Sequence, residues 1–169
     1  MNLQKLFFVF LLIVIFTTNT FAQSTATATA TATIIAPITI ANAVDMNFGN
    51  VAIQAGTAGT VVIAPAGTRT RTAGVTLPST TGTFTQASFT VGGEGVYTYA
   101  ITIPSTDYTI TDLISAATMI VNTFTSTPSG TGILTAGAQT LNVGATLNVG
   151  AAQTPGTYTN TTGFDVTVN

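Results

Sequence analysis

The chain has 169 residues, of which 46% are hydrophobic and only 5% are charged, and its formal net charge is −2 at pH 7. It contains no histidine, cysteine or tryptophan. Nucleophilic triads that need an imidazole base and zinc sites that need His or Cys ligands are therefore excluded. Three Lys or Arg residues are too few for a surface that binds nucleic acid or anionic lipid.

Residues 1–22 have the pattern of a secretory signal peptide. One cation, Lys5, precedes the apolar run Leu6–Phe16, and the segment closes on the triplet TFA, with small residues at the −3 and −1 positions. The apolar run is too short to span a bilayer. We expect cleavage before Gln23 and export to the periplasm, the cell surface or the medium, so that the processed protein is not integral to the membrane. A retained membrane anchor is the alternative.

The processed chain, residues 23–169, has 147 residues, which is long enough to bury a core without disulfides. Loss of Lys5 leaves two cations and five anions, so its net charge is 2 − 5 = −3. Threonine supplies 36 of the 147 residues. We therefore expect a neutral surface rich in hydroxyl groups on a β-structured protein.

The processed chain opens with an alternating segment, STATATATATII, which runs from Ser24 to Ile35. Threonines lie on one face, and the other face carries Ala26, Ala28, Ala30, Ala32 and Ile34. Pro37 interrupts the pattern, so we predict two extended segments, about 24–34 and about 38–48. The first has too little apolar area to order by itself. We predict that residues 23–35 form a strand that is laid into a groove, where main-chain hydrogen bonds supply the affinity.

The remaining residues, 36–169, predict an all-β domain. Period-two alternation recurs in residues 97–103, 108–111, 141–149 and 164–168, with Gly- and Pro-rich turns between the alternating segments. This pattern is typical of an antiparallel β-sandwich or barrel. The repeated LNVGA motif, at Leu141 and Leu147, predicts one long strand or a kinked pair bent at a glycine.

Two further segments leave alternatives open. A short helical turn could form around DLISAAT, within residues 111–122, although its β-branched content disfavours a helix. Arg69 and Arg71 share one side of a predicted strand and could clamp a carboxylate or phosphate. More often, such charges protect an edge strand from pairing with other chains.

The acidic residues give little support for catalysis. Paired carboxylates could hydrolyse glycosides, but the five acids are scattered and most sit in turns, so we interpret them as solvated. We expect no metal and no cofactor. Carbohydrate binding by exposed aromatic rings is an alternative, although most aromatic residues lie on the apolar faces of strands. Ice binding would need more stacked threonine rows than the one visible here.

Several motifs together carry a resemblance to a known family. These are ATATATATIIAPITI, VDMNFGNV (44–51), GTVVIAPAGTRT (59–70), SFTVGGEGVYTYAITIPS (88–105), the long run 124–159 and FDVTVN. In their order and in their amino-acid sequence, these motifs resemble the bacterial domain-of-unknown-function family 4402. The likeness covers nearly all of the processed chain, and that family has no assigned activity.

A more distant likeness is to spore-coat-U-type and archaic chaperone–usher pilins, which share an F-G after the first core strand and a P-G-T-Y-T before the last strand. Those proteins have incomplete immunoglobulin-like folds, each completed by a neighbour's N-terminal strand after a periplasmic chaperone has filled the gap. The likeness implies that Ala26–Ile34 is a donor strand. The chain differs from many such pilins in three ways: it lacks their disulfide, it carries NTT before Phe164, and it ends at Asn169.

The sequence thus predicts an immunoglobulin-like antiparallel β-sandwich with an extended N-terminal strand, in a non-enzymatic secreted subunit that self-associates into a linear polymer. The expected acceptor is the terminal strand, represented by Tyr158, Phe164, Val166 and Val168. A monomeric cell-surface adhesin or glycan-binding sandwich, with the N-terminal strand folded back in cis, is the alternative. An enzyme is the third.

Overall fold

A computed structural model describes Gln4 and residues 22–169. Within residues 22–169 the chain forms strands and turns and no α-helix. The predicted signal peptide lies outside the described residues, apart from Gln4 and Ala22. None of the helical structure described in the chain is long and apolar enough to cross a membrane. The chain divides into two units, residues 1–34 and Ile35–Asn169, and each is described separately.

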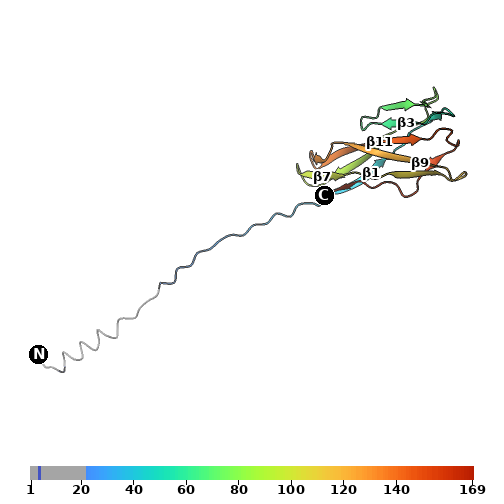
Figure 1. Ribbon diagram of the computed structural model, residues 1–169. Coiled ribbons are helices and arrows are strands. Elements are labelled where there is room, and N and C mark those ends of the chain that lie inside the picture. Colours follow the sequence, from blue (N-terminus) through green and yellow to red (C-terminus); the bar gives the residue numbers. More distant parts are fainter. Residues whose placement is uncertain (1–3, 5–21) are drawn as a thin grey trace. The chain divides into compact units, whose positions relative to one another are not determined.

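The second unit is built of short antiparallel strands (Figure 1). In chain order they are β1 (Thr39–Val44), β2 (Ala52–Ile53), β3 (Gly59–Ile63), β4 (Arg69–Ala73), β5 (Val75–Thr76), β6 (Ala87–Gly92), β7 (Thr98–Thr102), β8 (Tyr108–Asp112), β9 (Thr118–Thr127), β10 (Thr131–Ile133), β11 (Ala138–Val149), β12 (Tyr158–Thr159) and β13 (Thr167–Val168). Every ladder among them is antiparallel.

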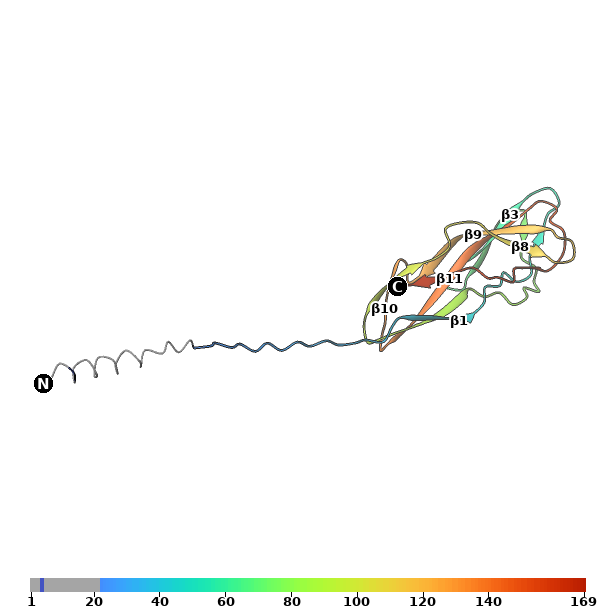
Figure 2. The same cartoon turned by 90° about the horizontal axis from the view of Figure 1, so that it is seen from below.

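The strands form a curled, sandwich-like body (Figures 1 and 2), which confirms the predicted all-β antiparallel fold. The larger sheet has the order β1-β6-β11-β9-β8-β12, and β3 joins it beside β11 and carries β4 on its other edge. A three-stranded sheet, β10-β7-β13, and the pair β2-β5 complete the body. The core between these layers includes the fully buried side chains of Val61, Ile63, Val75, Val91, Leu134, Leu141 and Val143.

β11 is the central strand, and it changes neighbours halfway along. One edge pairs with β6 up to Val143 and with β3 from Ala145 onward, while the other edge pairs with β9. Gly144 lies at this change of neighbours. Only glycine fits there, because a Cβ would collide with the backbone of Ile63, Ala64 and Pro65, where the chain leaves β3. The LNVGA repeat is therefore part of one long strand, which is the first of the two predicted alternatives, and Gly144 in it lies at a close backbone approach.

Burial along β11 alternates as the sequence predicts. The inward side chains of Leu141, Val143, Ala145, Leu147 and Val149 are all at most 4% exposed. The residues between them, apart from Gly144, are half-buried. The even spacing of the two repeats thus places the apolar residues of both on the core face of one strand.

A bulge in β9 is not visible in the sequence pattern. Opposite the step from Gly144 to Thr146, β9 advances from Thr125 to Asn122, which is one residue more. Thr123, inside this bulge, has a φ of 50°, which is uncommon for a β-branched residue. The extra residue changes the inward parity, so that Val121 and Phe124 both face the core.

One segment agrees with the sequence-based expectation and two differ from it. Residues 113–115 form the turn of the β8–β9 hairpin and contain no helix, in keeping with their β-branched neighbours. In the C-terminal segment, only Thr167–Val168 pairs as a strand, although the alternation of burial extends back to Phe164. The second extended segment pairs as β1 over residues 39–44, with a register shift inside the strand between Asn42 and Val44, and beyond it Asn47 makes only an isolated bridge with Thr85.

Substitution of Gly144 by valine tests the close approach between β11 and the end of β3. We expect Gly144→Val to lower the free energy of unfolding by about 3 kcal/mol, because the new side chain must displace buried backbone. Chemical denaturation measures the change. Gly56→Ala is the control, since a Cβ at Gly56 has nothing within 4 Å, and a similar loss in both variants would contradict the account.

Candidate functional site

The N-terminal segment carries the first set of predicted site residues. Residues 22–37 belong to no strand, and their side chains are exposed. This applies to the whole predicted donor face, Ala26, Ala28, Ala30, Ala32 and Ile34. Ile34 is 96% exposed, so the largest apolar side chain in residues 24–34 lies in solvent. The predicted N-terminal strand therefore has no ladder of its own in the structure.

The C-terminal segment, residues 158–169, carries the second set. Tyr158 pairs with Asp112 in β12, and its hydroxyl donates to the carbonyl of Thr154 at 2.6 Å. Phe164, Val166 and Val168 are half-buried and pack against the core, whereas Asp165 and Thr167 are exposed. The four predicted acceptor residues thus lie on one segment, and three of them, Phe164, Val166 and Val168, face the core.

This C-terminal segment has an open main-chain edge at each of its two paired ends, β12 and β13. Within the described residues, β12 pairs only with β8 and β13 only with β7. Asn169 exchanges two backbone hydrogen bonds with Ala100, at 3.2 and 2.7 Å. Because hydrogen-bonding direction alternates along an antiparallel strand, the N–H and C=O of Val168 point away from β7, toward the open edge.

β1 borders the same side of the body. It pairs only with β6 among the described strands, so its other edge is also open. Cα atoms of β1 and β13 come within 8 Å of each other, yet no ladder joins these two strands. In both views the C-terminus lies close to the start of β1 (Figures 1 and 2). Two neighbouring strand edges are therefore open where the two sheets meet.

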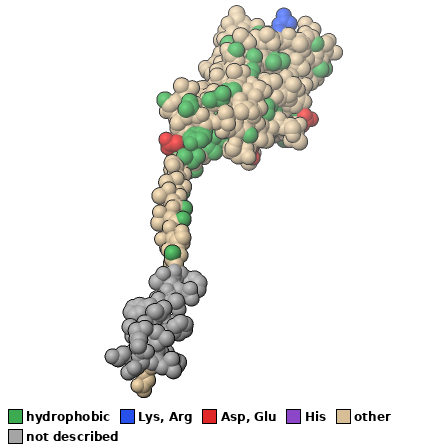
Figure 3. All heavy atoms as spheres, turned by 90° about the vertical axis from the view of Figure 1, so that its left-hand side faces the viewer, with side chains coloured by type: hydrophobic (Ala, Val, Ile, Leu, Met, Phe, Trp, Pro, Cys, Tyr) green, Lys and Arg blue, Asp and Glu red, His purple; other side chains and the backbone are tan. Residues whose placement is uncertain are grey.

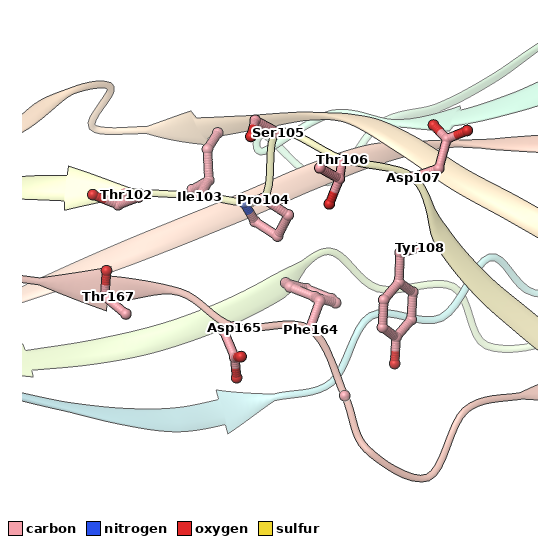
Figure 4. Close-up of a pocket in the computed structure, with 11 residues that line it drawn as sticks. Thr102, Ile103, Pro104, Ser105, Thr106, Asp107, Tyr108, Phe164, Asp165 and Thr167 are labelled. Atoms are coloured by element: carbon pink, nitrogen blue, oxygen red, sulfur yellow. The ribbon is translucent and has the colours of Figure 1, made fainter.

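A groove of about 400 Å³ lies beside the C-terminal segment, where it separates from the β7–β8 connection. Its lining residues are Thr102, Ile103, Pro104, Ser105, Thr106, Asp107, Tyr108, Gly163, Phe164, Asp165 and Thr167. Figure 4 shows the rings of Phe164 and Tyr108 in the gap between the two segments, with the carboxylates of Asp107 and Asp165 directed away from it. Hydroxyl groups and two aromatic rings therefore dominate the groove.

The ring of Phe164 packs against three other aromatic rings. Its centroid lies 4.9 Å from that of Phe124, 6.0 Å from that of Tyr108 and 6.5 Å from that of Phe89. The contacts with Tyr108 and Phe89 are edge-to-face, a favoured arrangement of aromatic pairs. Burial raises the pKa of Tyr108, a hydrogen bond with Thr162 lowers it, and the charge of Asp165 raises it further. The cluster anchors the C-terminal segment to the core.

Asp112 corrects the prediction that the acids are solvated. Its side chain is 3% exposed, whereas Asp45, Glu94, Asp107 and Asp165 are exposed as expected. The Ser115 hydroxyl donates to Oδ2 at 2.6 Å and the Ser115 N–H at 2.8 Å. These bonds, with backbone donors from Thr157 and Ile114, hold the pKa of Asp112 below its ordinary value of 3.8, against the opposing effect of burial.

The position of Asp112 connects two chain segments. Its carboxylate closes the β8–β9 turn through Ser115 and also accepts the N–H of Thr157, next to β12. A Cβ on Gly156 would lie 2.6 Å from Cγ of Asp112, so only glycine allows this approach. Asp112 thus fixes the start of the C-terminal segment.

The two arginines stabilise loops in the structure. β4 pairs only with β3 among the described strands, as expected for an edge that carries charge. Arg69 donates through Nη1 to the carbonyl of Phe48 at 2.7 Å and lies 4.6 Å from the ring centroid of Phe84. Arg71 donates to the carbonyl of Val75 at 2.9 Å. Their contacts are with protein carbonyls, so the interpretation as an anion clamp has no support here.

The F-G motif has a structural role in the same region. Gly49 has a φ of 69°, and a Cβ there would lie 2.5 Å from Nη1 of Arg69. Glycine is thus needed both for the backbone conformation and for the approach of the guanidinium. Within the described residues, no group of three acidic, His or Cys side chains is arranged to hold a metal ion.

Comparison with known proteins gives a family and no function. The model of the family described as "Domain of unknown function (DUF4402)" matches residues 38–169. The chain therefore belongs to this family. Neither a curated protein nor a solved structure matches it significantly.

Removal of the Asp112 charge tests its role at the start of the C-terminal segment. Because folding lowers its pKa, the carboxylate contributes stability that is present above the unfolded pKa and is lost as pH falls through the folded pKa. We expect Asp112→Asn to lower the Tm at pH 7 and to flatten the acid side of the profile below about pH 4. Thermal melts from pH 2 to 7 measure this, with exposed Glu94→Gln as the control. Parallel profiles for Asp112→Asn and the wild type would contradict the account.

Truncation of Arg69 separates a structural role from anion binding. We expect Arg69→Met to lower the free energy of unfolding by about 2 kcal/mol, because the partly buried Phe48 carbonyl loses a charged donor. Denaturant titration measures the loss, and exposed Arg71→Met should cost less. Stabilisation of the wild type by sulfate or phosphate that disappears in Arg69→Met would instead restore the clamp interpretation.

Proposed function

We propose that the protein is a non-enzymatic secreted structural subunit that assembles by strand donation into a fibre or another surface structure. Residues 24–34 of one copy pair with the open edge of the C-terminal segment of the next copy. The observation that carries the proposal is this edge, which combines outward N–H and C=O groups with half-buried Phe164, Val166 and Val168. Strand addition needs both a main-chain edge and apolar pockets.

The length of the donor suits the acceptor. Eleven extended residues span about 36 Å at roughly 3.3 Å per residue. β11, the longest strand of the body, has 12 residues and so a similar length. A donor of residues 24–34 therefore reaches along the whole body, from the level of Tyr158 to that of Val168.

The side chains of the donor suit a partly filled cleft. Alanines on one face can lie against Phe164, Val166 and Val168 without displacing them, and threonines on the other face remain hydrated. Ile34, at 96% exposure, gains most from burial, about 2 kcal/mol or more for a side chain of its size. The donor segment carries no charge, so no ion has to be desolvated on insertion.

The donor and the acceptor edge are different parts of one chain, which favours a linear assembly. Such head-to-tail contacts propagate from copy to copy unless the rotation closes a ring. Figure 3 shows a face on which charged side chains are few and widely spaced, so repulsion between stacked copies is small. The likeness to spore-coat-U-type and archaic chaperone–usher pilins supports the same mechanism. An immunoglobulin-like topology, a periplasmic chaperone and export by residues 1–22 are parts of the proposal.

A monomeric adhesin or glycan-binding sandwich is the second candidate. The hydroxyl-lined groove between the β7–β8 connection and the C-terminal segment favours it. Its aromatic rings, however, pack against one another instead of presenting a flat face to solvent. A glycan array tests this candidate, and saccharide binding by a protein that stays monomeric would favour it over strand donation.

Charge placed on either face of the donor tests strand donation. We expect Ala28→Glu to raise the concentration needed for assembly at least about tenfold, since the carboxylate would be buried in the cleft. Thr29→Glu, one residue away on the opposite face, should assemble nearly as well as the wild type. Sedimentation of the processed protein over a concentration series measures both.

Deletion of Ser24–Ile34 completes the test. The shortened protein should remain folded and monomeric, and a synthetic peptide of residues 24–34 should raise its Tm. Equal assembly of the Ala28 and Thr29 variants, or polymers that persist without the segment, would contradict strand donation.

A further inference from the structure

Two groups of exposed apolar side chains lie at opposite ends of the body. The first, here called the hairpin tip, is Leu113 and Ile114 in the β8–β9 turn, at 76% and 96% exposure. The second, here called the base surface, is Val96, Tyr97 and Ile133, at 75%, 51% and 54% exposure. Neither group takes part in the core.

The strand registers place the two groups at opposite ends. Val96 and Tyr97 precede β7, and Ile133 pairs with Thr98, near the end where Ala138 of β11 lies opposite Gly92. The hairpin tip follows β8, near the end where Asn148 lies opposite Ile120. Ten steps along β11, from Ala138 to Asn148, separate these ends by about 33 Å at roughly 3.3 Å per residue.

The hairpin tip is held in a defined conformation. The N–H of Asp112 donates to the carbonyl of Ala117, and the N–H of Ala116 donates to the carbonyl of Asp112, both at 2.9 Å. The Asp112 carboxylate fixes Ser115 from inside the turn. Turns usually carry small or polar residues, so two large aliphatic side chains on a well-bonded turn indicate a contact surface.

A second copy is the occupant that fits this surface, given the proposed strand donation. β1 begins at the base end, where Thr39 pairs with Gly92. Only Ile35–Ile38 separate the donor from β1, and four residues reach at most about 14 Å. The base end of the donating copy must therefore lie close to the point where Ile34 emerges from the acceptor.

The direction of the donor decides which end of the acceptor that is. The C-terminal segment runs from Tyr158, beside Asp112 at the hairpin end, to Val168, beside Ile101. A donor antiparallel to it places Ile34 at the hairpin end. A parallel donor would bring two base ends together and leave the hairpin tip uncovered, so the antiparallel direction is the one that brings the two exposed apolar groups together.

We propose that the hairpin tip of each copy docks on the base surface of the copy that donates a strand to it. This inference rests on the proposed function and adds a second, apolar interface between the same two copies. The interface fixes the angle between neighbours, which the four-residue connection alone leaves free.

The absence of cysteine from the chain makes the contact testable by disulfide trapping. Ile114→Cys and Ile133→Cys are introduced together, and the processed protein is assembled, oxidised mildly, denatured and run on a non-reducing gel. We expect a covalent ladder of three or more copies. Each single variant should give at most dimers, and the pair Ile114→Cys with Thr72→Cys, on the exposed β4 strand, should give no ladder.

The outcomes separate this inference from strand donation. Polymers without a covalent ladder would overturn the docking and leave donation intact. A covalent ladder that persists after deletion of Ser24–Ile34 would support the docking surfaces and overturn donation as the cause of assembly. The absence of both polymers and ladder would overturn both.

Discussion

The change of neighbours along β11 is the constraint on which the rest of the structure depends. A single strand holds β6 and β3 on one edge and β9 on the other, and Gly144 lets the chain leave β3 across the point of change. The bulge in β9 follows from the same step and turns Phe124 inward toward Phe164. The contact between Phe124 and Phe164 helps to anchor the C-terminal segment, so the central strand also determines where the open edge lies.

In this chain without cysteine, the hydrogen bonds of Arg69 and of the buried Asp112 carboxylate connect segments that are distant in the sequence. Arg69 binds the Phe48–Asn50 loop, and Asp112 joins the β8–β9 turn to the chain before β12. Two of the few charged residues, Arg69 and Asp112, thus act in holding the fold together. The exposed surface carries mainly threonine, four scattered acids and a few apolar groups, which suits contact between identical copies.

Strand faces could be predicted from the sequence because burial depends on local alternation. The pattern from Leu141 to Val149 and that from Phe164 to Val168 both hold in the structure. The bulge at Thr123 could not be predicted, since its cause is the pairing of β9 with a distant strand. The prediction that Asp112 is solvated is wrong, although an acid followed three residues later by Ser115 is a signal of a capped turn. The extended segment 24–34 pairs with no strand of the described chain, because its alanines and threonines bring too little apolar area to order it.

Amide hydrogen exchange in the C-terminal segment tests the central claim most directly. Val168 directs its N–H to the open edge, so this amide should exchange fast in a protein that lacks residues 24–34. In the assembled, processed protein the donor should accept this hydrogen bond and slow the exchange of peptides covering residues 164–169 by an order of magnitude or more. Equal exchange of these peptides in the two samples would show that no strand is added at this edge, and the proposed assembly would be wrong.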